Sequence, residues 1–210
     1  MMKLNWMLAL LFLFSGAIVN AQKMTIAQMK VNIEKAPNPV AYVRDVLKKK
    51  YKLDTITIAN STNFSGIADS LAYKGKQRKV YGPYDGKYLV QILGKAPNEF
   101  TRISQIFIDT STITLRIADS LANNIISRLR TGASFEDMAQ SYSMGGEART
   151  KGDLGWIARG SIMPEIEKEI KRHKKGEVFR LWSRTGLHII KRTSEPKEDA
   201  GFVLLLRVIL

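Results

Sequence analysis

The chain has 210 residues, with 33 lysines and arginines against 19 aspartates and glutamates, and it contains no cysteine. The lack of cysteine excludes disulfides and thiol chemistry, and two histidines are too few for a histidine-built metal centre, so we expect no metal and no cofactor. A net charge of +14 suggests an acidic partner or surface, although a solvated lysine-rich surface explains it equally well.

The first 21 residues are typical of an export signal. Lys3 precedes an uncharged, mostly apolar run over residues 6–19, and small residues end the segment at Ala21. The run is shorter than the roughly 20 residues that a membrane-spanning helix needs. We therefore predict a signal peptide over residues 1–21, export, and no integral membrane anchor after cleavage. An exported protein is not expected to bind nucleic acid.

Residues 22–100 have weaker patterns and form a predicted N-terminal accessory segment. Residues 22–36 form a polar-apolar leader of weak pattern. The following elements are, in order, an amphipathic helix over 40–51, a strand over 53–58, a short helix over 64–71, a turn over 81–86 and a strand over 88–93. Pro97 and Asn98 indicate a boundary before the second part of the chain.

The second part has clearer signals. Its predicted elements are a strand over 102–108, a helix after residues 109–111 with Ile117, Leu121, Ile125 and Leu129 on one face, a second helix after Ser134, a basic loop over 145–152, a strand over 154–158, a helix from Pro164 to the residues before Gly176, and strands over 178–182 and 187–192. This order predicts an α+β fold in which helices cover a small antiparallel sheet.

Five short motifs in the second part resemble the parvulin (PpiC-type, rotamase) family of peptidyl-prolyl cis–trans isomerases. They are Gly-Ala-Ser-Phe at 132–135, Gly-Asp-Leu-Gly-Trp at 152–156, Ile-Met-Pro-Glu-Ile-Glu at 162–167, Gly-Glu-Val at 176–178 and Gly-Leu-His-Ile-Ile at 186–190. The resemblance implies a parvulin-like domain over residues 101–194, with about four helices over the sheet. The exported members most similar in kind are the SurA-like chaperones.

The resemblance implies a periplasmic isomerase and chaperone that assists the folding or export of secreted and outer-membrane proteins. Its clients would be unfolded or proline-containing polypeptides. The alternative is a catalytically weak or inactive binding module, a subunit of an outer-membrane assembly or secretion complex. Residues 75–94 loosely echo the end of a parvulin unit, which would make part of the accessory segment a remnant of a repeat.

The proline-binding pocket of the family carries over to Leu154, Ile162 and Ile166, with Met163 beside them. The family usually has phenylalanine at the position of Ile166, and isoleucine lacks its flat aromatic face. The same side chains could equally be core residues of an ordinary domain.

The active-site polar cluster of the family is incomplete here. His188 matches the second of two family histidines, whereas Gln105 stands in place of the first and cannot carry charge. Ser143 and Thr185 match hydroxyl positions. The two residues after Ser143 are methionine and glycine where the family has aspartate or cysteine, so we expect the cluster to lack an acid or thiol.

The C-terminal residues extend beyond the expected end of a parvulin domain. A polar linker over 195–200 precedes an apolar segment over 201–210 that only Arg207 interrupts. Ten residues are too few to cross a bilayer as a helix. We predict a strand, paired either with an edge of the chain's own sheet or with a partner such as an outer-membrane complex, for which the basic surface is a second candidate site.

Overall fold

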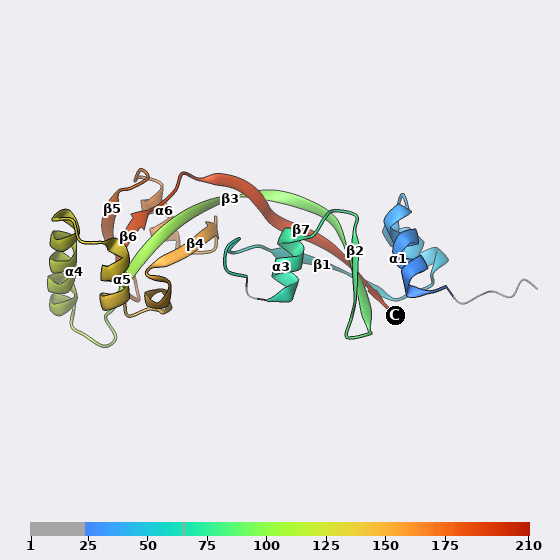
Figure 1. Ribbon diagram of the computed structural model, residues 1–210, viewed down its shortest axis with the longest axis horizontal. Coiled ribbons are helices and arrows are strands. Elements are labelled where there is room, and N and C mark those ends of the chain that lie inside the picture. The colour runs from blue at the N-terminus through green and yellow to red at the C-terminus, as the bar shows by residue number, and fades with distance from the viewer. Residues whose placement is uncertain (1–23, 65) are drawn as a thin grey trace, which may run out of the picture.

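The computed structural model describes residues 24–64 and 66–210, so the predicted signal peptide lies outside the described residues. Within them the predicted α+β class is confirmed. Figure 1 shows an elongated molecule with a group of helices towards each end. Strands β3 (Tyr88–Asp109) and β7 (Lys197–Ile209) run along the long axis and join the two ends.

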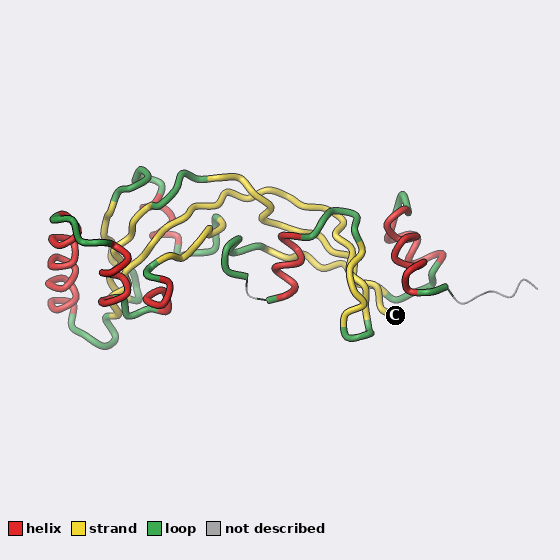
Figure 2. Tube along the Cα trace, in the orientation of Figure 1, coloured by secondary structure: helices red, strands yellow, loops and turns green. Residues whose placement is uncertain are grey.

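A single antiparallel sheet connects all the described strands. Its order is β1-β7-β3-β6-β5, and β2 and β4 pair with β3 beside this path. The remaining bounds are β1 Tyr51–Thr57, β2 Val80–Tyr84, β4 Asp153–Ala158, β5 Val178–Trp182 and β6 Gly186–Arg192. The tube in Figure 2 shows the curvature of these strands and the helices beside them.

One end of the molecule, formed by residues 101–194, is called here the isomerase-like part. Helices cover both faces of its sheet, because successive strand residues point to opposite sides. On one face, α4 (Leu115–Arg130) and α5 (Phe135–Tyr142) pack against Ile106 and Ile108 of β3. On the other face, α6 (Pro164–Ile170) packs against Ile103 and Ile190. These helices and strands match the predicted order. The predicted loop over 145–152 contains a short 3-10 turn, Gly146–Thr150.

The accessory segment is more regular than its sequence indicates. The leader of weak pattern, residues 22–36, contains α1 (Ile26–Lys35), which begins with a capping box between Thr25 and Gln28. The predicted helix over 40–51 stops early. It consists of α2 (Pro39–Ala41) and a π-helical turn (Tyr42–Val46), and β1 begins at Tyr51. Helix α3 (Ile67–Lys74) lies close to its predicted position.

The predicted boundary at Pro97 and Asn98 is wrong as a break in structure, because β3 continues through both residues. The register between β3 and β7 shifts between Ala96 and Pro97, which accommodates a residue without a backbone N–H. The division of the chain at residues 100 and 101 therefore falls inside one strand. The division of the chain into an accessory segment and a parvulin-like domain stays a prediction.

Of the two predicted alternatives for the C-terminal strand, pairing with the chain's own sheet is the one observed. From Phe202 to Val208, β7 is bonded to β1 on one side and β3 on the other. Both edges of this stretch are occupied, so pairing of the same strand with a partner is excluded in this fold. Among the described residues, no helix has both the length and the apolar character needed to cross a membrane.

Candidate functional site

His188 of β6 is buried and lies at the centre of a hydrogen-bonded chain of polar side chains. Its Nδ1 is 3.0 Å from Oε1 of Gln105 on β3, and its Nε2 is 2.7 Å from Oγ of Ser183. The imidazole also contacts the ring of Phe107, with 4.9 Å between ring centroids. Two neighbouring strands and the β5–β6 turn therefore hold this ring.

The direction of each hydrogen bond follows from the chemistry of its ends. The Glu147 carboxylate only accepts, so Gln105 Nε2, 3.4 Å from Glu147 Oε1, is the donor and Gln105 Oε1 faces His188. An amide oxygen also only accepts, so His188 carries its proton on Nδ1. Nε2 then accepts from the Ser183 hydroxyl. The chain is satisfied from end to end with a neutral imidazole.

Burial lowers the pKa of His188 below its ordinary value of 6.5, and the charges of Glu147 and Glu165 oppose this shift. Removal of water from around an imidazolium is the dominant cause, since the charged form loses most on burial. The lowered pKa and the hydrogen-bond directions agree. His188 is neutral at neutral pH.

The expectation that the cluster lacks an acid was wrong. Glu147 lies in the 3-10 turn after α5, and its Oε1 accepts from the Ser143 hydroxyl at 2.7 Å. Ser143 in turn accepts from the backbone N–H of Phe107 at 2.9 Å. The acid is four residues after Ser143 in the sequence, whereas the family has it one or two residues after. Glu147 reaches the cluster because the 3-10 turn folds back towards β3.

The Gly-Asp-Leu-Gly segment fixes the position of this turn against β3. Gly152 has φ +87°, and a Cβ there would lie 2.9 Å from the backbone oxygen of Gln105. The backbone N–H of Gln105 donates to the carbonyl of Gly152 at 2.9 Å. Asp153 pairs with Arg102 at 2.5 Å, which holds the pKa of this carboxyl below its usual range. At position 152, only glycine combines this positive φ with so close an approach to the backbone of Gln105.

Asn60 and Thr62 of the accessory segment hold β4 from its other side. The side-chain amide of Asn60 donates to the carbonyl of Leu154 at 2.6 Å, and the Thr62 hydroxyl accepts from the N–H of Trp156 at 3.0 Å. The segment that precedes the isomerase-like part thus supports one wall of the candidate site.

The four residues of the predicted proline pocket lie around α6. Leu154 is on β4, Ile162 and Met163 precede α6, and all three are half-buried beside the cluster of Ile103 and its neighbours. Ile166 on α6 is only 4% exposed and serves as a core residue in this structure. The other three can present apolar surface to a ligand.

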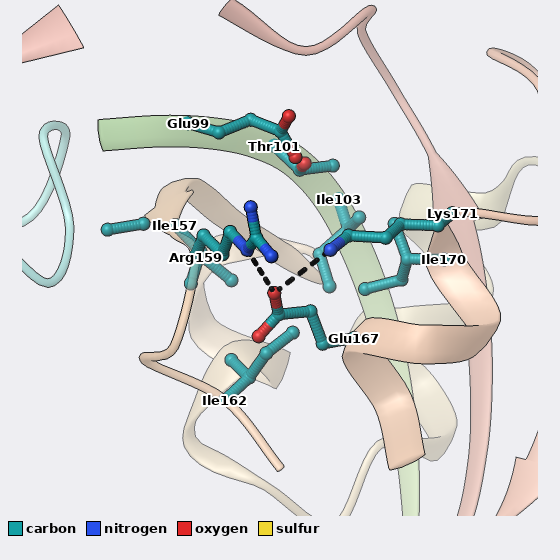
Figure 3. Close-up of a pocket in the computed structure, with 10 residues that line it drawn as sticks. Glu99, Thr101, Ile103, Ile157, Arg159, Ile162, Glu167, Ile170 and Lys171 are labelled. Atoms are coloured by element: carbon teal, nitrogen blue, oxygen red, sulfur yellow. Dashed lines mark ion pairs between the residues drawn. The ribbon is translucent and has the colours of Figure 1, made fainter. Parts of the chain in front are cut away.

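A small pocket continues along β3 from Ile162, towards Thr101 and Glu99 (Figure 3). Ile103, Ile157 and Ile170 form its apolar floor. At its mouth the Glu167 carboxylate lies between Arg159, at 3.8 Å, and Lys171, at 3.5 Å. These contacts are exposed ion pairs of small energetic value. They shape the rim of the pocket.

The structure brings His188 and Gln105 into direct contact, joins Ser143 to them through Glu147, and places Thr185 within 3.0 Å of Ser183. Sequence reasoning missed Glu147 and Ser183. Ser183 could have been found as a hydroxyl in the tight turn before His188. The role of Glu147 had no sequence signal, since it depends on how the 3-10 turn folds.

A sequence model of the PPIC-type PPIASE domain matches residues 87–196, which include the whole polar cluster. The chain belongs to the PpiC-type peptidyl-prolyl isomerase family. The matched range begins at the start of β3 and not at the predicted residue 101, in agreement with the continuity of that strand.

Individual members of the PpiC-type family show the same similarity. The chain is 39% identical to Chaperone SurA of Vibrio cholerae over 75 residues, 35% of this chain and 17% of that protein. It is 33% identical over 102 residues to Chaperone SurA of Saccharophagus degradans, 47% of this chain and 24% of that one. It is 40% identical over 76 residues to Foldase protein PrsA of Bacillus subtilis, 35% of this chain and 26% of the foldase. The matches thus span about a quarter or less of each relative.

Proposed function

We propose that this chain is a peptidyl-prolyl cis–trans isomerase that acts as a chaperone on unfolded, proline-containing polypeptides. The observation that carries the proposal is the hydrogen-bonded pair of buried His188 and half-buried Gln105, which lies on the same sheet face as the apolar residues around α6. Membership in the PpiC-type family supports the same activity. The names of the relatives, a chaperone and a foldase, support the chaperone part.

Isomerisation about a prolyl bond needs no covalent step. The barrier of about 18–20 kcal/mol arises from amide resonance, so a catalyst must hold the proline ring, remove water from the amide and favour the twisted state. Leu154, Ile162 and Met163 can hold the ring. The neutral imidazole of His188, held by hydrogen bonds at both ring nitrogens, supplies a rigid polar wall that adds no positive charge to the site.

A binding module with little isomerase activity is the second candidate. It is favoured by Gln105, which replaces a family histidine, and by the burial of Ile166, which removes one side chain from the predicted pocket. Such a module would bind the same clients without accelerating exchange.

The proposed location is the periplasm, on the basis of the predicted signal peptide over residues 1–21. Association with an outer-membrane complex is a finer proposal, which now depends on the basic surface alone because both edges of β7 are occupied between Phe202 and Val208.

The decisive experiment measures cis–trans exchange of an Ala-Pro-containing peptide by NMR, with residues 22–210 of the chain. The isomerase proposal predicts catalysed exchange that falls in His188→Ala and persists in His173→Ala, the matched variant at the only other histidine. Line broadening of the peptide without faster exchange would instead establish the binding module. If His188→Ala leaves the catalysed exchange unchanged, the His188 cluster is not the active site.

A further inference from the structure

The second possible binding surface is the outer edge of β1, far from His188 along the sheet. In the part of the chain that the structure describes, β1 pairs only with β7, and it is an end strand of the sheet. At its two ends, Lys50 accepts from Ile209 and Ile58 donates to Gly201, so the even-numbered residues direct their backbone groups to β7. Because an antiparallel strand alternates, the N–H and C=O groups of Tyr51, Leu53, Thr55 and Thr57 point away from the sheet.

An exposed apolar patch lies next to this edge. Leu53 is 51% exposed, and Phe202 and Leu204 of β7 are each 40% exposed. All three share one face of the sheet, since Leu53 pairs with Leu206 and Thr55 pairs with Leu204. Farther along the same face, Leu206 and Val208 are buried by the cluster that includes Met29 and Ile33 of α1. The N-terminal helices therefore leave the middle of β7 uncovered.

Unpaired positive charge flanks the same edge. Lys48, Lys49, Lys50 and Lys52 stand at the start of β1, and within residues 24–64 and 66–210 none of them forms an ion pair. A ligand strand that runs antiparallel to β1 would place its C-terminal end beside these lysines. Acidic residues at that end would be complementary.

We propose that the β1 edge binds an extended polypeptide segment by strand addition, with apolar residues at alternate positions and acidic residues at its C-terminal end. The outward backbone groups of Thr55 and its alternate neighbours supply the hydrogen bonds. Leu53, Leu204 and Phe202 receive the apolar side chains. A second copy of the chain is disfavoured as the occupant, because two copies each carry a net charge of +14 and repel each other.

The proposed surface goes beyond the isomerase site and is independent of it. A client segment held at β1 would stay tethered while another part of the same polypeptide visits the His188 cluster, which raises the effective concentration of its prolyl bonds. The two sites can fail separately, so each can be tested without the other.

The test uses a fluorescent peptide of about eight residues that alternates valine and threonine and ends in two aspartates, with binding measured by anisotropy. Thr55→Pro removes an outward N–H at an edge position that tolerates proline, whereas the matched Thr55→Val keeps that N–H. We expect affinity to fall about tenfold in Thr55→Pro, as expected when a backbone hydrogen bond is lost and the added strand is disturbed. Thr55→Val should bind normally, and both variants should keep the isomerase exchange of the parent protein.

Peptide chemistry supplies a control that leaves the protein unchanged. N-methylation at one alternate set of amides should abolish binding, and methylation of the other set should leave it intact, because only one set faces β1. Equal binding by Thr55→Pro and Thr55→Val, or equal effects of the two methylation patterns, would overturn the proposal. A concentration-dependent dimer that dissociates only in Thr55→Pro would also overturn it and assign the edge to a second copy.

Discussion

His188 Nδ1 donates to Gln105 Oε1 across 3.0 Å, and this bond fixes the tautomer of the imidazole, whereas burial lowers its pKa and keeps it neutral. Gln105 is held in turn by its contact with Glu147. A glutamine in place of a histidine thus preserves the hydrogen-bonded geometry while it removes one titratable group. The replacement of histidine by glutamine at position 105 therefore bears on the tautomer, the pKa and the activity expected when residues of the site are substituted.

The tautomer of His188 gives the first prediction. In the folded protein at neutral pH, ¹⁵N chemical shifts should show a protonated Nδ1 and an unprotonated Nε2. Ser183→Ala removes the donor to Nε2 and should lower the free energy of unfolding by about 1 kcal/mol, because a buried acceptor loses its partner. Thr185→Val, beside it, should cost less. Shifts typical of an Nε2-protonated ring would contradict the assignment.

Gln105→His tests the missing histidine. The side chain would face His188 from β3, as the family arrangement implies, and we expect cis–trans exchange to rise a few-fold, equivalent to about 0.5–1 kcal/mol of transition-state stabilisation. NMR exchange of the Ala-Pro peptide measures the effect, with Gln105→Asn as the control for a shortened amide. An unchanged or lower rate in Gln105→His would count against this position as the first histidine site.

Glu147 is predicted to act through its charge as well as its hydrogen bonds. Its charge opposes the lowering of the His188 pKa, so Glu147→Gln should lower that pKa further while it keeps an acceptor for Ser143. Glu147→Ala should in addition reduce the free energy of unfolding by about 1 kcal/mol through the lost bonds. NMR titration of His188 and denaturant unfolding measure the two effects. A His188 pKa that does not respond to Glu147→Gln would exclude the charge effect.

Stability should depend on pH through His188. Burial lowers the pKa of the folded state below the ordinary 6.5, so between these two values the unfolded chain binds a proton that the folded protein does not. The free energy of unfolding should therefore fall as pH decreases below 6.5, by at most about 1.4 kcal/mol per pH unit, until the lowered pKa is reached. His188→Gln should lack this slope. An identical pH dependence in parent and variant would show that His188 does not contribute.

Deletion of residues 201–210 should unfold the accessory end of the molecule, because β7 connects β1 to β3 there. We expect loss of a cooperative thermal transition for this end and rapid proteolysis of residues 24–86. Deletion of Leu210 alone, which follows β7, is the control and should change little. A soluble truncated chain with its full helix and strand content would show that β7 is dispensable.

Local patterns were sufficient for much of the isomerase-like part. Apolar spacing predicted α4, capping residues predicted the start of α5, and the five motifs identified the family before any geometry was known. These features depend on neighbours three or four residues apart, or on turn glycines such as Gly152, whose effect is local. The assignment of His188 and Gln105 to one cluster followed from the resemblance.

The sequence by itself determined the fold class, the order of elements between residues 102 and 192, and which histidine stands at the centre of the site. Tertiary structure alone decided that Glu147 supplies the acid, that β3 continues through Pro97, and that β7 lies between β1 and β3. Each of these depends on partners far apart in the chain, or on a turn whose direction is set by packing. A strand's partner and a loop's direction are properties of the assembled sheet, and no short window of residues contains them.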